Sequence, residues 1–475
     1  GRRSGGLRSL QFVRAGGLYP LFEVGVNTKL SEKFHKMRSV FLKRPHISIF
    51  RPECGTASPV QTQNEIQKSK PVVPPTAEPQ ASSLTAADLK LALNQQLIQK
   101  VAAEQATAEK IERPAKNIYG LTLSDLAAEL KGLGKEKFRA GQIYKWVFEK
   151  RVSDFEEMSN VSKEFRKELP KLFSLHLPKP TAHLKSKDGT QKFLFKLEDG
   201  YTVEAVLIPS EGRETLCVSS EVGCNMACAF CFTGKQKLKR RLRADEIVAQ
   251  FMMVEDMIKK DNPDARVTNV VFMGMGEPLD NPDEVFKSIE ILHEPTGRNF
   301  SRRKFTVSTS GLVPEMYRIA QSKTRLAVSL NGYDEESRTK LMPINKKYPL
   351  PMLLDACSKY CEETGDRVTF EYVLLKGITD QLEHAKKVWQ LVRHIPCKIN
   401  IIPFNEHPGS EFQRPDDAQV EKFHAELMRL GAHVLLRRTM GRDIFAACGQ
   451  LTSEFENKPT NMDISNSKLG GRNRV

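Results

Sequence analysis

Three cysteines lie close together in the segment GCNMACAFCFTG, which spans residues 223–234. Cys224, Cys228 and Cys231 follow a Cys-x3-Cys-x2-Cys spacing, and no histidine is near them. Thiolates are soft ligands that suit iron–sulfur clusters, and a four-iron cluster takes four ligands. Three protein ligands leave one iron open to bind a substrate or a cofactor. A structural zinc site would use a fourth Cys or His, so we expect a cluster rather than zinc or three core cysteines.

The elements that must position these cysteines form a repeating pattern from Thr215 onward. Strand-like runs alternate with helix-like runs, and the predicted strands cover residues 215–222, 268–275, 304–311, 325–331, 367–375 and 397–404. This alternation predicts an α/β fold with a parallel sheet, either open or rolled into a partial barrel. Ligands of such folds bind at the carboxyl ends of the strands. The cysteine segment follows the first strand, and GMGEP, STSG, SLN and PFN end four others, so we expect one site there.

The segments that precede this pattern differ in composition. Residues 52–115 combine a Pro/Ser/Gln-rich linker with one predicted helix at 84–111. Residues 116–180 predict a helical accessory unit, which either docks RNA or only packs against the body. Residues 181–209 predict a β-hairpin extension, because two alternating runs flank Glu-Asp-Gly. We place the catalytic domain at 210–451 and a polar, disordered tail at 452–475.

The net charge of +15 is concentrated in one part of the chain. Residues 1–51 contain eleven Lys or Arg and two acids, whereas the other 424 residues contain 62 basic and 56 acidic side chains. The total charge is therefore weak evidence for nucleic-acid binding. The Arg-rich, acid-poor arm at 1–51 has the composition of a mitochondrial or plastid targeting segment, and a disordered basic tail on a cytoplasmic protein is the alternative.

Two classes of protein are disfavoured by composition. No apolar run approaches the roughly 20 residues that span a bilayer, which predicts a protein without a membrane partner. Nine cysteines in 475 residues are too few for a disulfide scaffold. We therefore expect reduced, metal-bound or catalytic cysteines.

The motifs from Ile118 to Leu451 resemble those of one enzyme family in content and order. The three-cysteine segment and MGMGEP at 273–278 are similar to the cluster loop and the S-adenosylmethionine (SAM) segment of radical SAM enzymes. TLCVSSEVGCNMACAFC, NVVFMGMGEPLDN, STSG, PINKKY, CKINIIPFN and AACGQL together resemble the RlmN/Cfr family of RNA methyltransferases. The resemblance implies a radical SAM partial (β/α)6 barrel, a helix-hairpin-helix-like N-terminal domain, a [4Fe-4S] cluster and SAM.

The resemblance also assigns residues to SAM. The open iron would bind the amino and carboxylate groups of SAM, and Glu277 would hold the amino group, since a carboxylate suits an ammonium. Asn331 departs from the family pattern, which usually has His there. A backbone or amide contact tolerates this change, whereas an imidazole role does not. The implied SAM contacts are Gly276, Glu277, Ser308, Ser329, Leu330, Asn331 and Asn405.

Two further cysteines carry the implied methyl transfer. Cys448, in AACGQL, resembles the cysteine that the family methylates with a first SAM. A radical from a second SAM would take a hydrogen from that S-methyl group, and the carbon radical would add to adenine C2, which resists polar methylation. Cys217 resembles the partner thiol that removes the C2 proton and forms a transient disulfide with Cys448. Glu204 matches the family's proton acceptor, and an ordinary strand carboxylate is the alternative.

A basic run follows the cysteine segment. KQKLKRRLR, at 235–243, contains six basic residues and no acid. We predict contact with RNA phosphates, and a solvated charge run is the alternative. The implied partners are rRNA or tRNA and a flavodoxin- or ferredoxin-type electron donor, and we expect a monomer. The predicted RNA contacts are Lys239, Arg240, Arg241 and Arg243.

Three other functions stay open from the sequence. Adenine-C8 methylation, as in Cfr, would use the same cysteines and give a different nucleoside. A glycyl-radical activase or another radical SAM enzyme would leave Cys217 and Cys448 without roles. A non-catalytic RNA-binding assembly factor would not need Cys448, yet every motif residue is present.

Overall fold

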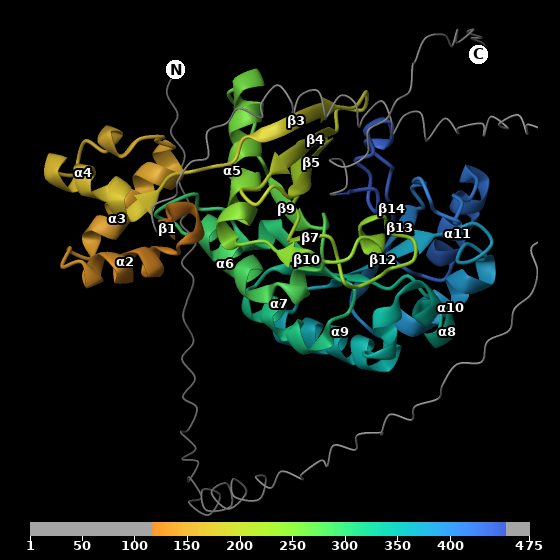
Figure 1. Cartoon of the computed structure of the whole chain (residues 1–475). Helices are drawn as coiled ribbons and strands as arrows, with labels where there is room; N and C mark the ends of the chain where they lie inside the picture. The colour runs from red at the N-terminus through yellow and green to blue at the C-terminus, as the bar shows by residue number, and fades with distance from the viewer. Residues whose placement is uncertain (1–115, 453–475) are drawn as a thin grey trace, which may run out of the picture. The chain divides into compact units, whose positions relative to one another are not determined.

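The computed structural model describes residues 116–452, which form a helical unit followed by an α/β domain (Figure 1). The predicted arm at 1–51, the linker and its helix at 84–111, and nearly all of the predicted tail lie outside these residues. Among residues 116–452, no helix combines the length and the apolar character needed to cross a bilayer.

A ten-stranded sheet organises the α/β domain, in the order β14-β13-β12-β11-β10-β9-β6-β5-β4-β3. Neighbouring strands from β6 to β14 all pair in parallel. The parallel strands are β6 (Arg213–Cys217), β9 (Asn269–Phe272), β10 (Phe305–Thr309), β11 (Arg325–Ser329), β12 (Val368–Leu374), β13 (Cys397–Pro403) and β14 (Val434–Leu436). Because buried parallel strands need apolar side chains on both faces, they appear in the sequence as short apolar runs.

Helices connect these strands and cover the outer side of the sheet, as the arc of helices in Figure 1 shows. Phe305 and Phe370 of the strands are fully buried in the core, as is Phe423 of the last helix. The connecting helices are α5 (Ala244–Asp261), α6 (Pro282–His293), α7 (Tyr317–Gln321), α8 (Glu335–Leu341), α9 (Leu350–Thr364), α10 (Leu382–Val392) and α11 (Asp417–Arg429). The predicted α/β fold with a parallel sheet is confirmed.

Two details of the predicted sheet were wrong. The strand predicted at 215–222 ends at Cys217, and the chain then turns before β7 (Glu221–Val222), which pairs with β8 (Arg240–Arg241). The structure also adds β14 as a further parallel strand. β14 is only three residues long, which is too short to give a periodic signal.

The antiparallel extension carries the parallel sheet beyond β6. β4 (Gln191–Lys196) and β5 (Thr202–Ser210) form the predicted hairpin, and β5 pairs with β6. A third strand, β3 (Pro180–Lys185), pairs with β4 and was not predicted as a strand. The extension thus places β5 next to the strand that ends in Cys217, with β4 one strand further out.

The helical unit precedes the extension and contains α2 (Leu123–Gly132), α3 (Phe138–Lys145) and α4 (Lys163–Leu172). Thr122 caps α2, because its hydroxyl accepts the Asp125 N–H while the Asp125 carboxylate accepts the Thr122 N–H. Short strands β1 (Lys116–Asn117) and β2 (Phe173–Ser174) pair in parallel and bring together the ends of the unit. Arg151 joins this unit to α5 by donating from Nε to Asp256, at 3.1 Å. The helix-hairpin-helix-like interpretation stays a prediction.

Candidate active site

A cavity of about 170 Å³ opens where the parallel strands end, and we call it the central pocket. Its walls include the predicted cluster ligands, most of the predicted SAM contacts and the predicted methyl-carrying cysteine. These lining residues are Cys224, Cys228, Cys231, Gly276, Glu277, Ser308, Ser329, Asn331, Asn405 and Cys448. These residues come together because the carboxyl ends of all the parallel strands lie at the same edge of the sheet.

The loop at 223–234, which we call the cluster loop, presents three thiols to the central pocket. Its backbone is tied internally by the Cys231 N–H, which donates to the Cys228 carbonyl at 3.1 Å. Ala227 has φ 51°, a left-handed conformation that costs a non-glycine residue roughly 1–3 kcal/mol and often marks a functional site. A side chain at Gly234 would meet the Cys228 carbonyl oxygen at 2.8 Å, so only glycine fits there.

The three thiols fit a cluster in their chemistry. Burial raises the pKa of Cys224, Cys228 and Cys231, so without a nearby cation they are neutral thiols. Bound iron supplies the positive charge that favours thiolates. Among the described residues, no three His, Cys, Asp or Glu side chains converge as ligands of a single ion do. The thiolates of a [4Fe-4S] cluster each bind a different iron, so such convergence is not expected of them.

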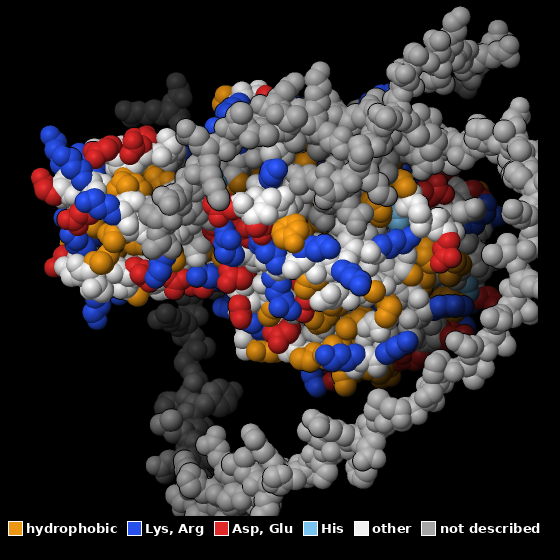
Figure 2. All heavy atoms as spheres, in the orientation of Figure 1, with side chains coloured by type: hydrophobic (Ala, Val, Ile, Leu, Met, Phe, Trp, Pro, Cys, Tyr) orange, Lys and Arg blue, Asp and Glu red, His pale blue; other side chains and the backbone are white. Residues whose placement is uncertain are grey.

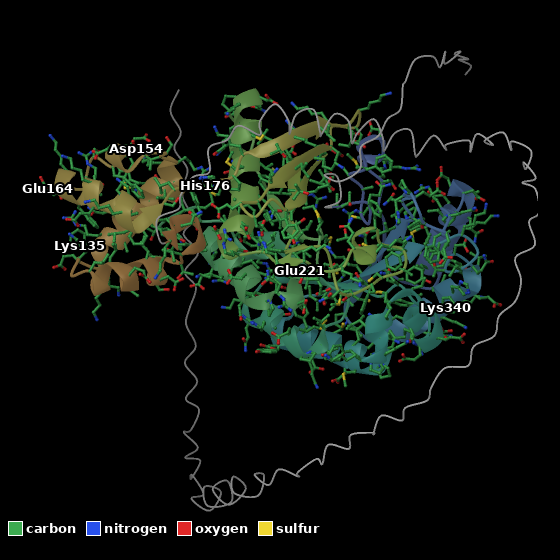
Figure 3. The ribbon with its side chains drawn as sticks, viewed as in Figure 1. Lys135, Asp154, Glu164, His176, Glu221 and Lys340 are labelled. Atoms are coloured by element: carbon green, nitrogen blue, oxygen red, sulfur yellow. The ribbon has the colours of Figure 1, made fainter. Side chains whose placement is uncertain are left out.

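Glu277 is held in place by backbone groups at the edge of the pocket. Its Oε2 accepts the Ser310 N–H at 2.7 Å and its Oε1 accepts the Leu279 N–H at 3.1 Å. Burial raises the pKa of this carboxyl. At Gly276 φ is +97°, and an added Cβ would lie 2.5 Å from Glu221, so the turn into Glu277 requires glycine. Glu221 is fully buried, and Figure 3 labels it within the outline of the α/β domain.

Cys448 and Cys217 both interact electrostatically with one arginine. Arg437, which follows β14, has its pKa raised by the Cys448 thiol and by Glu371 and Cys217. Burial raises the pKa of Cys217 to about 12, and Cys448 adds to this effect while Arg437 opposes it. Both cysteines are free thiols in the structure. Arg437 and Cys448 also line a second, smaller cavity of about 40 Å³ beside the central pocket.

Known proteins are similar to this chain in sequence over most of its length. A family model for the radical SAM superfamily matches residues 218–388, and a model for the ribosomal RNA large subunit methyltransferase N-terminal domain matches residues 116–175. The dual-specificity RNA methyltransferase RlmN of Bdellovibrio bacteriovorus is 62% identical over 369 residues, which cover 78% of this chain and 92% of that protein. The chain belongs to the RlmN family.

Other relatives agree with this membership. The dual-specificity RNA methyltransferase RlmN of Geobacter sulfurreducens is 47% identical over 341 residues, which cover 72% of this chain and 93% of that protein. A crystal structure of a radical SAM methyltransferase from Sphaerobacter thermophilus superposes with a TM-score of 0.68 at 39% identity, covering 72% of this chain and all of that one. RlmN enzymes use a [4Fe-4S] cluster and SAM, and the thiol set of the cluster loop fits that cofactor.

Asn331, where the resemblance implied histidine, makes a side-chain bond to the neighbouring strand. Its Oδ1 accepts the Val373 N–H at 2.9 Å, which ties the end of β11 to β12. Asn331 lines the central pocket. Its backbone has φ 45°, a left-handed conformation in which asparagine is enriched. Leu330 is fully buried and does not line the pocket, so only its backbone is suited to a SAM contact.

Asn405 links the pocket to the Cys448 backbone. Its Nδ2 donates to the Cys448 carbonyl at 3.2 Å. Its Oδ1 is buried and has no hydrogen-bond partner in the described structure. A buried amide oxygen without a partner is costly and commonly marks a ligand position, which agrees with the predicted SAM contact.

Glu204 lies apart from the predicted site. It is fully buried on β5 and forms an ion pair with Lys192, whose Nζ lies 3.0 Å from Glu204 Oε1. Burial raises the pKa of Glu204, and Lys192 opposes this effect. Glu204 is not among the residues that line the central pocket. Its role as proton acceptor stays a prediction.

The predicted RNA contacts are largely engaged by acids of the same chain. Arg240 donates to both carboxylate oxygens of Glu246 at 2.8 Å and also contacts Asp199. Arg241 pairs with Asp280 at 2.9 Å, and Arg243 pairs with Asp245 at 3.0 Å. Lys239 is exposed. In Figure 2 acidic and basic side chains are interspersed on the visible face, so a charge run does not by itself make a basic surface.

These ion pairs lead to a prediction for Arg240. We expect Arg240→Glu to lower the stability of the fold by on the order of 2 kcal/mol, because it leaves the buried carboxylate of Glu246 beside a like charge. Lys239→Glu makes the same charge change on an exposed side chain and should leave the melting temperature unchanged. Thermal melts of both variants check this, and RNA titrations of Lys239→Glu test phosphate contact separately. Equal melting temperatures for the two variants would contradict the expectation.

Two charged residues of the pocket were missed in the sequence. Glu371, on β12, and Arg437 both line the central pocket. Asn400 Nδ2 donates to Glu371 at 2.9 Å, and burial raises the pKa of that carboxyl. A charged residue inside an otherwise apolar strand was the available signal for Glu371. Arg437 follows β14, which was not predicted as a strand, so no sequence signal indicated that Arg437 lies at the carboxyl end of a strand.

The Cys217 thiol gives a prediction about pH. Burial raises the pKa of Cys217 to about 12, so a much smaller fraction of this thiol is ionised at pH 8 than of a free cysteine, whose pKa is about 8.5. Alkylation of Cys217 should therefore rise about tenfold per pH unit from pH 7 to 10 without a plateau. Arg437→Met removes a positive charge and should lower the rate at every pH, whereas the exposed Arg438→Met should not. Peptide mapping by mass spectrometry measures the rates, and a plateau near pH 8.5 would show this account to be wrong.

Proposed function

We propose that this protein methylates C2 of adenine in RNA through a methylated Cys448, with two SAM molecules used per turnover. One observation carries the proposal: Cys448 lines the same pocket as the three cluster-loop thiols and Glu277. A methyl group on its sulfur would therefore lie within the cavity where SAM binds. The curated relatives are named dual-specificity RNA methyltransferases, which supports RNA as the substrate.

The cofactors and the protein side chains have different roles in the proposed reaction. The [4Fe-4S] cluster would be held by Cys224, Cys228 and Cys231, and with SAM it supplies a 5′-deoxyadenosyl radical. The chain supplies position and proton transfer. Glu277, fixed by two backbone N–H groups, offers its carboxylate to the SAM amino group. Asn405 holds the Cys448 carbonyl and still has a free amide oxygen for a ligand.

We assign the last step to Cys217, which does not line the central pocket but interacts electrostatically with Cys448 and Arg437. Once the radical adduct has given up one electron, for which the oxidised cluster would be the acceptor, the Cys217 thiolate would take the proton from adenine C2. The Cys217 sulfur, ionised again, would then attack the Cys448 sulfur and break its bond to the methylene carbon. The electron pair of that bond would stay on the methylene carbon, which takes a proton and becomes the methyl group, and a transient Cys217–Cys448 disulfide would remain. The electrostatic coupling of Cys217, Cys448 and Arg437 supports this proposal. A thiol with a raised pKa becomes a strong base once it is ionised, and Arg437 provides the positive charge that favours ionisation.

The remaining parts of the proposal concern partners and location. We propose a flavodoxin- or ferredoxin-type protein as the electron donor, because reductive cleavage of SAM needs a one-electron reductant. We propose a monomer that acts on rRNA, tRNA or both. The arm at 1–51 is proposed as an organelle-targeting segment on its composition. Diffuse cytosolic fluorescence from a reporter fused to residues 37–60 would oppose that targeting role.

Product analysis tests the proposed function. The protein is reconstituted with iron and sulfide without oxygen, reduced, and given SAM with a trideuterated methyl group and either rRNA or tRNA. The expected product of nuclease digestion is 2-methyladenosine with two deuteria from the transferred methyl group, because one is lost to the radical. 8-Methyladenosine would instead support the Cfr-like reaction. The absence of any methylated adenosine from both RNAs would favour the non-catalytic RNA-binding alternative.

A further inference from the structure

A fully buried ion pair lies under the segment that carries Cys448. Lys192 on β4 and Glu204 on β5 have side chains that are 1% and 0% exposed, and their charged atoms are 3.0 Å apart. Neither residue lines the central pocket. Taking two charges out of water costs free energy that their attraction often fails to repay, so apolar replacements of such pairs are often equally stable. Stability alone therefore does not explain this pair.

Each partner of the pair also holds the backbone on one side of Cys448. Lys192 Nζ donates to the Phe445 carbonyl at 3.2 Å, and Glu204 Oε2 accepts the Thr452 N–H at 3.2 Å. These two backbone groups lie three residues before and four residues after Cys448. The pair thus fixes both ends of a short loop that has the sulfur near its middle.

The backbone of Glu204 is also bonded to the segment that follows Cys217. The Ser219 hydroxyl donates to the Glu204 carbonyl at 2.6 Å, and Ser219 is two residues beyond Cys217. Phe445 has φ 50°, a left-handed conformation that a bulky residue rarely adopts unless its surroundings impose it. The bond from Lys192 to the Phe445 carbonyl is one such restraint.

We propose that Lys192 and Glu204 are positioning residues, which hold the Cys448 loop so that its sulfur faces both Cys217 and the central pocket. Ionic hydrogen bonds are directional and costly to leave unmade, whereas apolar packing would let the loop slide. In this proposal Glu204 acts through Cys448 and takes no proton from the substrate. The inference rests on the proposed role of Cys448 as methyl carrier.

The first test measures how readily Cys448 in the loop is alkylated, and it does not depend on RNA methylation. The full chain and its Lys192→Met variant are treated with N-ethylmaleimide, and alkylation of Cys448 is followed by peptide mapping. We expect Lys192→Met to raise the alkylation rate about tenfold, because the loop opens more often once one end is released. Lys185→Met is the matched control, since Lys185, on β3 of the same extension, forms an exposed ion pair with Asp261 of α5. A wild-type rate in Lys192→Met would overturn the proposal whether or not the protein methylates RNA.

The second test compares Lys192→Met with Glu204→Gln in RNA methylation. Glutamine keeps one of the two oxygens, so it can preserve either the Thr452 N–H bond or the Lys192 contact, yet it cannot act as a base. Positioning therefore predicts that Lys192→Met loses more methylation than Glu204→Gln, and that Lys192→Arg restores part of it. A proton acceptor predicts complete loss in Glu204→Gln with unchanged Cys448 alkylation, and that result would overturn the proposal. If Lys192→Met does not fold, the Glu204→Gln result decides the question alone.

Discussion

Cys448→Ala should abolish RNA methylation while the protein still binds its cluster and cleaves SAM. Among the described residues, the substitution removes the only cysteine thiol of the central pocket that lies outside the cluster loop. Because no other thiol can carry the methyl group into that cavity, we expect product formation to fall at least about a thousandfold. The measurements are methyl transfer to RNA, release of 5′-deoxyadenosine, and the absorbance of the reconstituted cluster.

Cys397→Ala is the matched control for this variant. Cys397 begins β13, is half-buried and does not line the central pocket. Its loss should leave methyl transfer within about twofold of wild type, since it removes a single atom from the edge of the core. Retained methylation in Cys448→Ala would exclude a methylated Cys448 as the intermediate, and loss of the cluster would assign Cys448 a structural part in cofactor binding instead.

Cys217→Ala should trap the RNA on the protein. The methylene carbon would then join Cys448 to adenine C2, and no thiolate would be in place to remove the C2 proton and take over the Cys448 sulfur. General bases contribute about 10²–10⁴-fold to such proton transfers, so the adduct should accumulate within a single turnover. The adduct is measured as labelled RNA that migrates with the protein on a denaturing gel. This band should disappear when Cys448 is also replaced.

The buried location of Cys217 sharpens this expectation. Cys217 is 4% exposed at the end of β6, next to β9 in the sheet, so the bulk solvent cannot readily supply a substitute base. Cys217→Ser should also trap the adduct, because a hydroxyl is a much weaker acid and cannot form the disulfide. Free product with normal yield from Cys217→Ala would refute the role of this thiol in resolving the adduct.

The sequence predicted the parallel sheet because its strands are short apolar runs between helices of ordinary length. β10 and β12 illustrate this, since Val307, Phe370 and Tyr372 are fully buried. The same reasoning failed for β3 and β14. β14 has three residues, and only two residues of β3 are buried, so neither gives a periodic apolar signal.

The composition of the central pocket was predictable for a topological reason. Motif residues that follow different strands converge because every strand of a parallel sheet ends at the same edge, and Ser308, Ser329 and Asn405 all line the pocket as expected. Arg437 was not predictable by this rule, because its strand was not recognised.

The ion pairs of the basic run could not be predicted from local sequence. Arg240 and Arg241 are paired with Asp199 and Asp280, which are about 40 residues away in the chain. A run of positive charges indicates a basic surface only if no acid from elsewhere folds against it. That information is in the tertiary structure, where β7 and β8 bring the run beside these acids.

The contacts of the cluster loop with the segment after Cys448 have a consequence for biosynthesis. The Phe232 N–H donates to the Gly449 carbonyl at 2.8 Å, and the Thr233 hydroxyl donates to the Leu451 carbonyl at 2.7 Å, across 218 residues in the second case. A ribosome makes the cluster loop and most of the parallel strands long before it makes Gly449. During synthesis the segment after Cys448 therefore docks against the cluster loop last, so the three thiols exist for an interval before these two bonds can form.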